Sequence, residues 1–440
     1  MGGVLRWFIW LLPFHIVVMA GLFALAGVPA PIVRALATWK ELLVLVLVIV
    51  VAGAALAGRG SRITPRAPDL AVAGFGFVAL AYLIGSQAWF DADLPIGAQV
   101  LGWRDAVFFT LLYFVGRTTP AVARDRRTLR ALVVVGVVTS VIAIVERLVV
   151  TPEALVVLGV SQYVQDYLGL TITTIHNPFG LPDNYWTGIG NRLVQRAGST
   201  YLSSQGFAIP FLVILPAATL AALRAERWRT AAWVAVGLSW IGLLLTITRM
   251  TLVSCALQSL ALLAMFRRWS VAVTGMLLVT VALATAFLTV PGLGTFARET
   301  VTFESASSLS HLEDWSEGVT ALGEHPLGVG LGAGGLTAAR FGLPVVAGDS
   351  QYFKYSVELG ILGLAFYLAT LATLLAAAGR VYTSSRSSML RTYAGLTTVT
   401  ALGIIFNGLT TLPITHPALA YPFFWIAGSV VSAGDDEASG

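Results

Sequence analysis

The chain has 440 residues, of which 57% are hydrophobic and only 11% charged, with a formal net charge of +5. A sequence this apolar cannot bury its side chains in one water-soluble globule, so the composition indicates a polytopic membrane protein. The basic residues occur in short polar segments without interleaved aromatic residues, which argues against a nucleic-acid partner.

Twelve apolar stretches are long enough to cross a bilayer, because hydrocarbon about 30 Å thick requires roughly 20 apolar residues per helix. They lie near residues 7–27, 39–57, 69–89, 98–116, 131–150, 204–223, 231–247, 250–266, 270–290, 352–376, 392–411 and 417–433. The sequence therefore predicts an all-α polytopic membrane protein with about twelve transmembrane helices in a single membrane domain, residues 1–440.

A signal peptide is the alternative interpretation of the first stretch, because the small residues of segment 27–30 follow the apolar run. The run is long for the apolar part of a signal peptide, so we expect an uncleaved helix. Arginines are concentrated in alternate polar segments, from Arg6 to Arg391. Basic residues near span ends are retained on the cytoplasmic side. We therefore expect both termini in the cytoplasm and the long polar loops outside.

Two polar segments on the expected outer side are much longer than the other loops, residues 151–203 and residues 291–351. Loops of this length in a compact protein are usually functional or disordered, and their aromatic content argues against disorder. Charges are nearly absent from the middle of the expected spans, which disfavours a transporter with a site in mid-membrane. We expect chemistry in these two extracytoplasmic loops.

The second loop contains the signature of a short amphipathic helix. Ser310 is followed three residues later by Glu313, a pattern typical of a helix start. Apolar residues then recur at helical spacing, and Trp315 among them is suited to the bilayer interface. A glycine-rich segment follows at residues 325–335. Its backbone N–H groups can approach an anion or a sugar, and a flexible bend is the alternative interpretation.

Three outer arginines stand close to expected span ends. Arg249 interrupts the apolar run 231–266 at a tight turn, and Arg192 and Arg196 precede the sixth span on the same side. A guanidinium at the membrane boundary pairs well with phosphate oxygens, although a residue that simply marks the span end is the alternative. Together they suggest a lipid-linked diphosphate as ligand.

Four segments then resemble the O-antigen ligase and O-antigen polymerase superfamily of bacterial membrane glycosyltransferases. Residues 39–43 resemble the start of the family's second span, residues 196–200 its arginine-glycine segment, and residues 248–249 its Ser/Thr-Arg turn. Residues 311–332, followed by 348–353 and 358–363, resemble its Trp, its Pro-x-Gly-x-Gly segment and its His/Asp-Asn leader into a Glu-x-Gly-x-x-Gly helix. Each motif alone is degenerate, so the resemblance rests on the order of the motifs and on their expected position on the same side of the membrane.

The resemblance implies a GT-C type fold, a polyprenyl-diphosphate-linked glycan donor, a glycan or lipid-linked acceptor, and transfer without a metal ion or other cofactor. It implies that Arg196 and Arg249 bind the diphosphate. Asp349 stands where ligases of the family place a histidine base, and this departure favours a polymerase. His311 is a second candidate for proton transfer, with a surface residue at a helix start as its alternative.

A competing signal is Asp91-Ala92-Asp93, because paired carboxylates at this spacing can chelate a divalent cation. The prediction is a polysaccharide polymerase of the bacterial cytoplasmic (inner) membrane, in contact with membrane lipids and with an extracytoplasmic active site. A ligase that transfers glycan to a lipid, protein or wall acceptor is one alternative. A flippase or transporter of the lipid-linked glycan is another.

Overall fold

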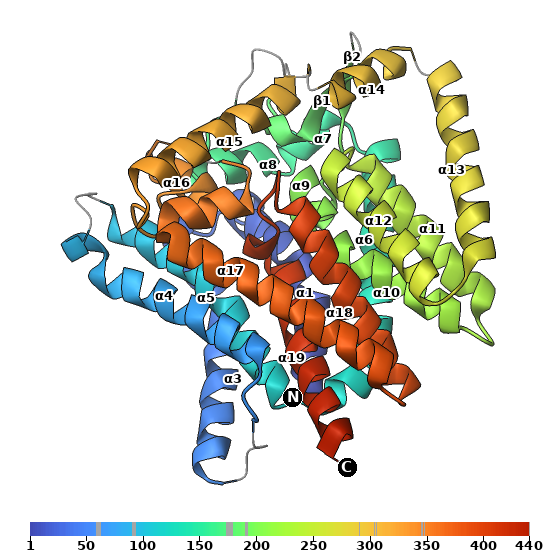
Figure 1. The fold of residues 1–440 in the computed structure, drawn as a ribbon. Coiled ribbons are helices and arrows are strands. Elements are labelled where there is room, and N and C mark those ends of the chain that lie inside the picture. The colour runs from blue at the N-terminus through green and yellow to red at the C-terminus, as the bar shows by residue number, and fades with distance from the viewer. Residues whose placement is uncertain are drawn as a thin grey trace.

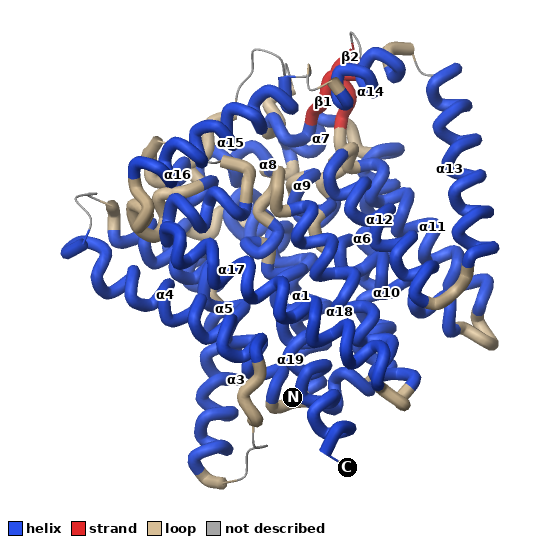
Figure 2. Tube along the Cα trace, viewed as in Figure 1, coloured by secondary structure: helices blue, strands red, loops and turns tan. Residues whose placement is uncertain are grey.

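The computed structural model describes residues 1–440 except 59–62, 90–93, 173–178, 190–191, 290, 303, 305, 345, 347 and 440. In this part of the chain nearly all regular structure is helical, with a single two-stranded hairpin at one end of the molecule (Figure 2). The architecture agrees with a polytopic membrane protein.

The long helices are those of the bundle and of the outer loops. They are α1 (Gly2–Ala20), α3 (Trp39–Leu56), α4 (Ala67–Trp89), α5 (Ile96–Arg117), α6 (Arg126–Val149), α10 (Phe211–Arg224), α11 (Arg229–Leu245), α12 (Arg249–Met265), α13 (Trp269–Thr289), α15 (Ala306–Glu324), α17 (Gln351–Ser384), α18 (Ser388–Asn407) and α19 (Pro417–Ser439).

Short elements connect them. The α-helical ones are α2 (Ala30–Ala37), α7 (Pro152–Val157), α8 (Val160–Gln162), α9 (Ser204–Ala208), α14 (Leu293–Val301) and α16 (Gly335–Arg340). The 3-10 and π turns are η1 (Gly21–Leu25), η2 (Pro120–Arg124), η3 (Tyr163–Tyr167), η4 (Asp183–Tyr185), η5 (Ser199–Tyr201) and η6 (Pro413–Thr415). The hairpin consists of β1 (Trp186–Ile189) and β2 (Arg192–Gln195).

Each of the twelve apolar stretches expected from the sequence coincides with one of these helices. By length and apolar composition alone, eight helices within the described residues qualify as membrane spans, and α11 and α12 are apolar but shorter. The number of twelve spans therefore stays a prediction. The single cysteine, Cys255, is a free thiol buried inside α12.

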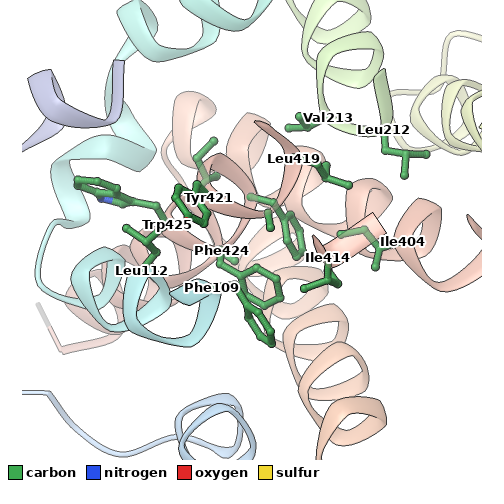
Figure 3. Packing of buried hydrophobic residues seen from close by; sticks show 14 of the residues in the cluster. Phe109, Leu112, Leu212, Val213, Ile404, Ile414, Leu419, Tyr421, Phe424 and Trp425 are labelled. Carbon is green, nitrogen blue, oxygen red and sulfur yellow. The ribbon is translucent and has the colours of Figure 1, made fainter. Parts of the chain in front are cut away.

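The centre of the bundle is built around α19, which packs along α5 (Figure 1). Phe109 of α5 and Phe424 of α19 have ring centroids 4.4 Å apart, and Figure 3 shows these rings among the buried apolar side chains. A Cβ on Gly428 would lie 2.1 Å from the Tyr113 carbonyl oxygen. Small residues thus allow the two backbones to approach closely, the usual means of packing helices in a membrane.

Both termini lie at one end of the molecule, and the hairpin, α14 and α15 lie at the other (Figure 1). At the end of the molecule that holds both termini, the buried Arg117 guanidinium forms ion pairs with Asp69 at 2.8 Å and with Asp435 at 3.0 Å. These pairs connect α5 with α4 and α19. The arrangement fits the expectation that both termini share a side and that the two long loops occupy the opposite one.

One local expectation required correction. The amphipathic helix α15 begins at Ala306, so Ser310 lies inside the helix and does not cap it. Its Trp315 indole donates a hydrogen bond of 2.8 Å to the Leu409 carbonyl oxygen, and Gly318 lies against the ring of Phe353. Packing on the α17 and α18 ends stabilises a longer helix than the capping pattern predicts. The hairpin and the helices α14 and α16 were not predicted.

Candidate active site

Arg196 follows the hairpin and is fixed against the turn between α11 and α12. Its backbone N–H donates to the Tyr185 carbonyl oxygen at 2.7 Å. Its guanidinium donates from Nε to the Thr246 carbonyl oxygen at 2.7 Å and from Nη2 to the Thr248 hydroxyl at 2.9 Å. Because both donors engage this turn, the side chain has a defined direction.

Arg249 is the first residue of α12 and directly follows Thr248. Its guanidinium carbon lies 5.2 Å from the centroid of the Phe296 ring, on α14. Burial and the nearby charge of Arg249 lower the pKa of Arg196 to about 10. Within the described residues no carboxylate lies within ion-pair distance of Arg196. The positive charge of Arg196 therefore lies near that of Arg249 and is not balanced by an ion pair of its own.

The backbone after Arg196 is held by a buried carboxylate that the sequence did not identify. Glu146 of α6 accepts hydrogen bonds from the backbone N–H groups of Gly198 at 3.0 Å and Ser199 at 2.6 Å. The Ser199 hydroxyl donates to the Thr139 carbonyl oxygen at 2.8 Å. Glu146 therefore positions the segment that carries Arg196. A lone Glu near a span end gave no signal of this role, because the contact joins residues more than fifty positions apart.

A second polar group forms where the outer loop returns to the bundle. His311 and Asp314 of α15 and Asp349 before α17 place one ligand atom each within 4.8 Å of one another. Burial raises the pKa of Asp349, as does the negative charge of Asp314, while His311 acts in the opposite direction. An imidazole and two carboxylates at this spacing can exchange a proton, and the same set can hold a divalent cation.

The last turn of α18 connects the two groups. Asn407 donates from its side-chain amide to the Thr251 hydroxyl at 2.9 Å, and Thr251 is two residues beyond Arg249. The Gly408 carbonyl oxygen accepts from the backbone N–H of Gln351 at 2.9 Å and from the Ser350 hydroxyl at 3.3 Å. Since Ser350 directly follows Asp349, the arginine turn and the Asp349 group are attached to neighbouring residues of the same helix end.

The glycine-rich segment 325–335 approaches an anion that belongs to the protein. The backbone N–H groups of Gly332 and Gly334 face Glu358 Oε1 at 3.2 and 3.4 Å, and Lys354 forms a buried ion pair with the same oxygen. A Cβ on Gly332, whose φ is +83°, would lie 2.2 Å from the Ala98 carbonyl oxygen. The glycines here allow close packing and internal hydrogen bonds, so this structure assigns them a scaffold role.

The remaining candidates stand apart. Arg192 is exposed on β2, opposite Ile189, and four extended residues place its backbone about 13 Å from that of Arg196. The hydrogen bonds described above engage Arg196 and leave Arg192 outside this group. Asp91 and Asp93 lie outside the described residues. The described contacts thus bring Arg196 close to Arg249, and His311 close to Asp349.

Comparison with known proteins gives one family. Residues 234–368 match the family model described as O-antigen ligase. No curated protein matches the chain. The matched segment includes the α11–α12 turn with Arg249, helix α15 with His311, and the first part of α17 with Glu358. The match supports membership of this chain in the O-antigen ligase superfamily, a class of glycosyl-transferring membrane enzymes.

Proposed function

We propose that the chain is a membrane glycosyltransferase that polymerises polyprenyl-diphosphate-linked glycan units on the outer face of the cytoplasmic membrane. The observation that carries the proposal is the hydrogen bond from the Arg196 guanidinium to the hydroxyl of Thr248, the residue that directly precedes Arg249. Two guanidinium groups that lie close together can bind one phosphate-type anion through several charge-assisted hydrogen bonds. A diphosphate at the head of a lipid carries its charge at this depth.

The reaction places negative charge where these arginines lie. The acceptor hydroxyl oxygen forms a bond to the anomeric carbon of the donor glycan, and the bond from that carbon to the diphosphate oxygen breaks. The electron pair leaves with the polyprenyl diphosphate. Arg196 and Arg249 stabilise this developing charge, the task that a divalent cation performs in other transferases. Arg192 is a peripheral contact in this proposal, because it is exposed on β2.

The hydroxyl proton passes to Asp349. Burial raises the pKa of this carboxyl above its ordinary value, which makes its carboxylate a stronger base. His311 lies beside Asp349 and can carry the proton onward or hold the carboxylate in place. The direct partners of this step are the acceptor hydroxyl and Asp349, and the atoms balance without a metal ion.

A ligase that transfers the glycan to a different acceptor is the second candidate. The description of the matching family as O-antigen ligase favours it. The chemistry at the donor is the same in both cases, because a ligase and a polymerase break the same bond. The identity of the acceptor is therefore the property that separates them.

The test is reconstitution of the full chain in liposomes with a labelled polyprenyl-diphosphate glycan. We expect release of polyprenyl diphosphate together with longer glycan chains, and no release in Arg249→Ala. Transfer to an added lipid or protein acceptor without elongation would favour the ligase. Movement of intact donor across the bilayer, with no release of polyprenyl diphosphate, would show that the chain is a transporter and not a glycosyltransferase.

A further inference from the structure

A second cationic group lies among the outer segments, on residues other than those of the proposed diphosphate site. Arg34 of α2 and Arg340 of α16 lie near Tyr163 and Tyr167 of η3, and Arg104 of α5 lies near Arg340. The two tyrosine rings stack with centroids 4.9 Å apart, and the Arg34 guanidinium carbon lies 5.8 Å from the Tyr167 centroid. Four elements distant in sequence thus contribute to one polar group.

The charges of this group are only partly balanced. Arg104 forms ion pairs with Asp105 at 2.8 Å and with Glu41 at 3.7 Å. In the part of the chain that the structure describes, Arg34 and Arg340 have no carboxylate within ion-pair distance. Burial and the charge of Arg104 lower the pKa of Arg340. The group therefore holds more positive charge than its own carboxylates neutralise.

The cationic side chains are accessible from outside the bundle. Arg34 is exposed, Arg340 is partly buried, and 33% of the Arg104 side chain is exposed. Beside Arg104 a small cavity is lined by Asp105, Thr415 and Tyr421, among other residues. A ligand can therefore contact the exposed parts of the three arginines from outside the bundle.

The chemistry of the group fits an oxyanion. A guanidinium is planar and donates two parallel hydrogen bonds to a carboxylate or phosphate group. Burial raises the pKa of Tyr163 and of Tyr167, so both phenols stay protonated and remain able to donate. A neutral sugar hydroxyl would leave the excess positive charge uncompensated.

We infer that Arg34, Arg104 and Arg340, with the hydroxyl groups of Tyr163 and Tyr167, bind an oxyanion carried by the acceptor glycan. The identification of the ligand as an acceptor rests on the proposed function. The oxyanion is either the carboxylate of an acidic sugar or a phosphate group, because the same donors recognise both. The site would position an acceptor for attack while Arg196 and Arg249 hold the donor.

The first experiment measures binding of small probes to the purified full chain in detergent, without donor. The probes are methyl glucuronide as the carboxylate, glucose 1-phosphate as the phosphate and methyl glucoside as the neutral sugar. We expect at least one anionic probe to bind the wild type and to lose affinity by about tenfold or more in the double variant Arg34→Gln/Arg340→Gln. The probe that behaves in this way shows whether the oxyanion on the acceptor glycan is a carboxylate or a phosphate group.

Two controls accompany the binding experiment. Arg380→Gln removes one positive charge from an exposed position on α17, toward the opposite end of the bundle. This variant should bind the probes as the wild type does. Arg340→Lys keeps the charge but not the planar fork and should lose less affinity than Arg340→Gln. Failure of both anions to bind the wild type, equal binding by the double variant, or an equal loss for methyl glucoside would each overturn the inference.

Activity separates this inference from the proposed function. In the reconstituted reaction the double variant should raise the KM for an anionic acceptor by about tenfold and leave the KM for the donor unchanged. A wild type that binds the anions but transfers no glycan would disprove the proposed function and keep the oxyanion site. A double variant that transfers glycan with unchanged acceptor KM would disprove the oxyanion site alone.

Discussion

The guanidinium of Arg196 donates a hydrogen bond of 2.9 Å to the hydroxyl of Thr248, the residue that directly precedes Arg249. This contact joins the segment before α9 to the turn between α11 and α12. It orients one arginine toward the residue beside the other, although 52 positions separate Arg196 from Thr248. Arginines that act on one anion must be held in this way, since a misplaced guanidinium loses most of its effect on a transition state.

Replacement of the arginines tests their role directly. We expect Arg196→Ala or Arg249→Ala to lower kcat for glycan transfer by about 10²- to 10³-fold, as for the loss of one charge-stabilising donor. Arg249→Lys should recover part of the activity, because it keeps the charge but not the two-donor geometry. The measurement is release of polyprenyl diphosphate from labelled donor. Arg192→Ala should cost less than tenfold, and a loss as large as that of Arg196→Ala would contradict the peripheral position of Arg192.

Replacement of Thr248 tests the contact itself. Thr248→Val removes the hydroxyl and keeps the shape, so Arg196 retains its bond to the Thr246 carbonyl oxygen and loses the other. We expect a fall in kcat of about tenfold, the effect of roughly one hydrogen bond. In an Arg196→Ala background the same change should have little further effect. Additive losses in the double variant would show that Thr248 acts independently of Arg196.

Asp349 links activity, stability and pH. Its folded-state pKa is raised by burial, so the folded protein binds the proton more tightly than the unfolded chain does. The stability contributed by the protonated form is present at low pH and is lost as pH rises from the ordinary aspartate value through the raised one. We therefore expect Asp349→Asn to be more stable than the wild type at pH 7, with the difference disappearing at pH 3.

The same substitution should remove the base. We expect kcat for Asp349→Asn to fall by about 10²- to 10⁴-fold. Wild-type activity should decline as the pH is lowered through the raised pKa of Asp349. Thermal unfolding across the pH range and initial rates measured in parallel check both expectations. A variant that is less stable at pH 7 and fully active would refute the assignment.

The metal alternative for His311, Asp314 and Asp349 has a separate test. Under the proposed mechanism, EDTA leaves glycan transfer unchanged, and added Mn²⁺ gives no stimulation. If chelation removed the activity, Mn²⁺ restored it, and Asp314→Asn abolished this restoration, the three residues would be identified as a cation site. Binding of Mn²⁺ measured by electron paramagnetic resonance gives a readout that does not depend on activity.

The buried pair of Lys354 and Glu358 should matter for stability. Glu358→Gln leaves the Lys354 ammonium without its counter-charge in the interior, and we expect destabilisation by about 3 to 5 kcal/mol. It also weakens the hydrogen bonds from Gly332 and Gly334 that hold the glycine-rich segment. Thermal unfolding and protease sensitivity of residues 325–335 measure these effects. Glu437→Gln, on the exposed end of α19, is the matched control.

The sequence by itself determined the class of the protein and the residues of interest. Hydropathy identified apolar stretches that coincide with helices, because helices alone satisfy backbone groups across so much apolar sequence. The motifs of the last loop led to a resemblance to the O-antigen ligase family, and the model of that family matches residues 234–368. The pattern also indicated Arg249 at a turn, since the apolar run around it is too long for one span.

Only the tertiary structure decided how these residues meet. Sequence periodicity carries no information on contacts between segments, so the hydrogen bonds from Arg196 to the α11–α12 turn and from the Gly198 backbone N–H to Glu146 were not predictable. From the sequence, the glycines of residues 325–335 are equally compatible with a ligand-binding loop and with a flexible bend. Their role followed from Glu358, whose buried carboxylate already accepts their N–H groups. Long-range packing, which depends on the whole bundle, thus separated scaffold residues from candidates for chemistry.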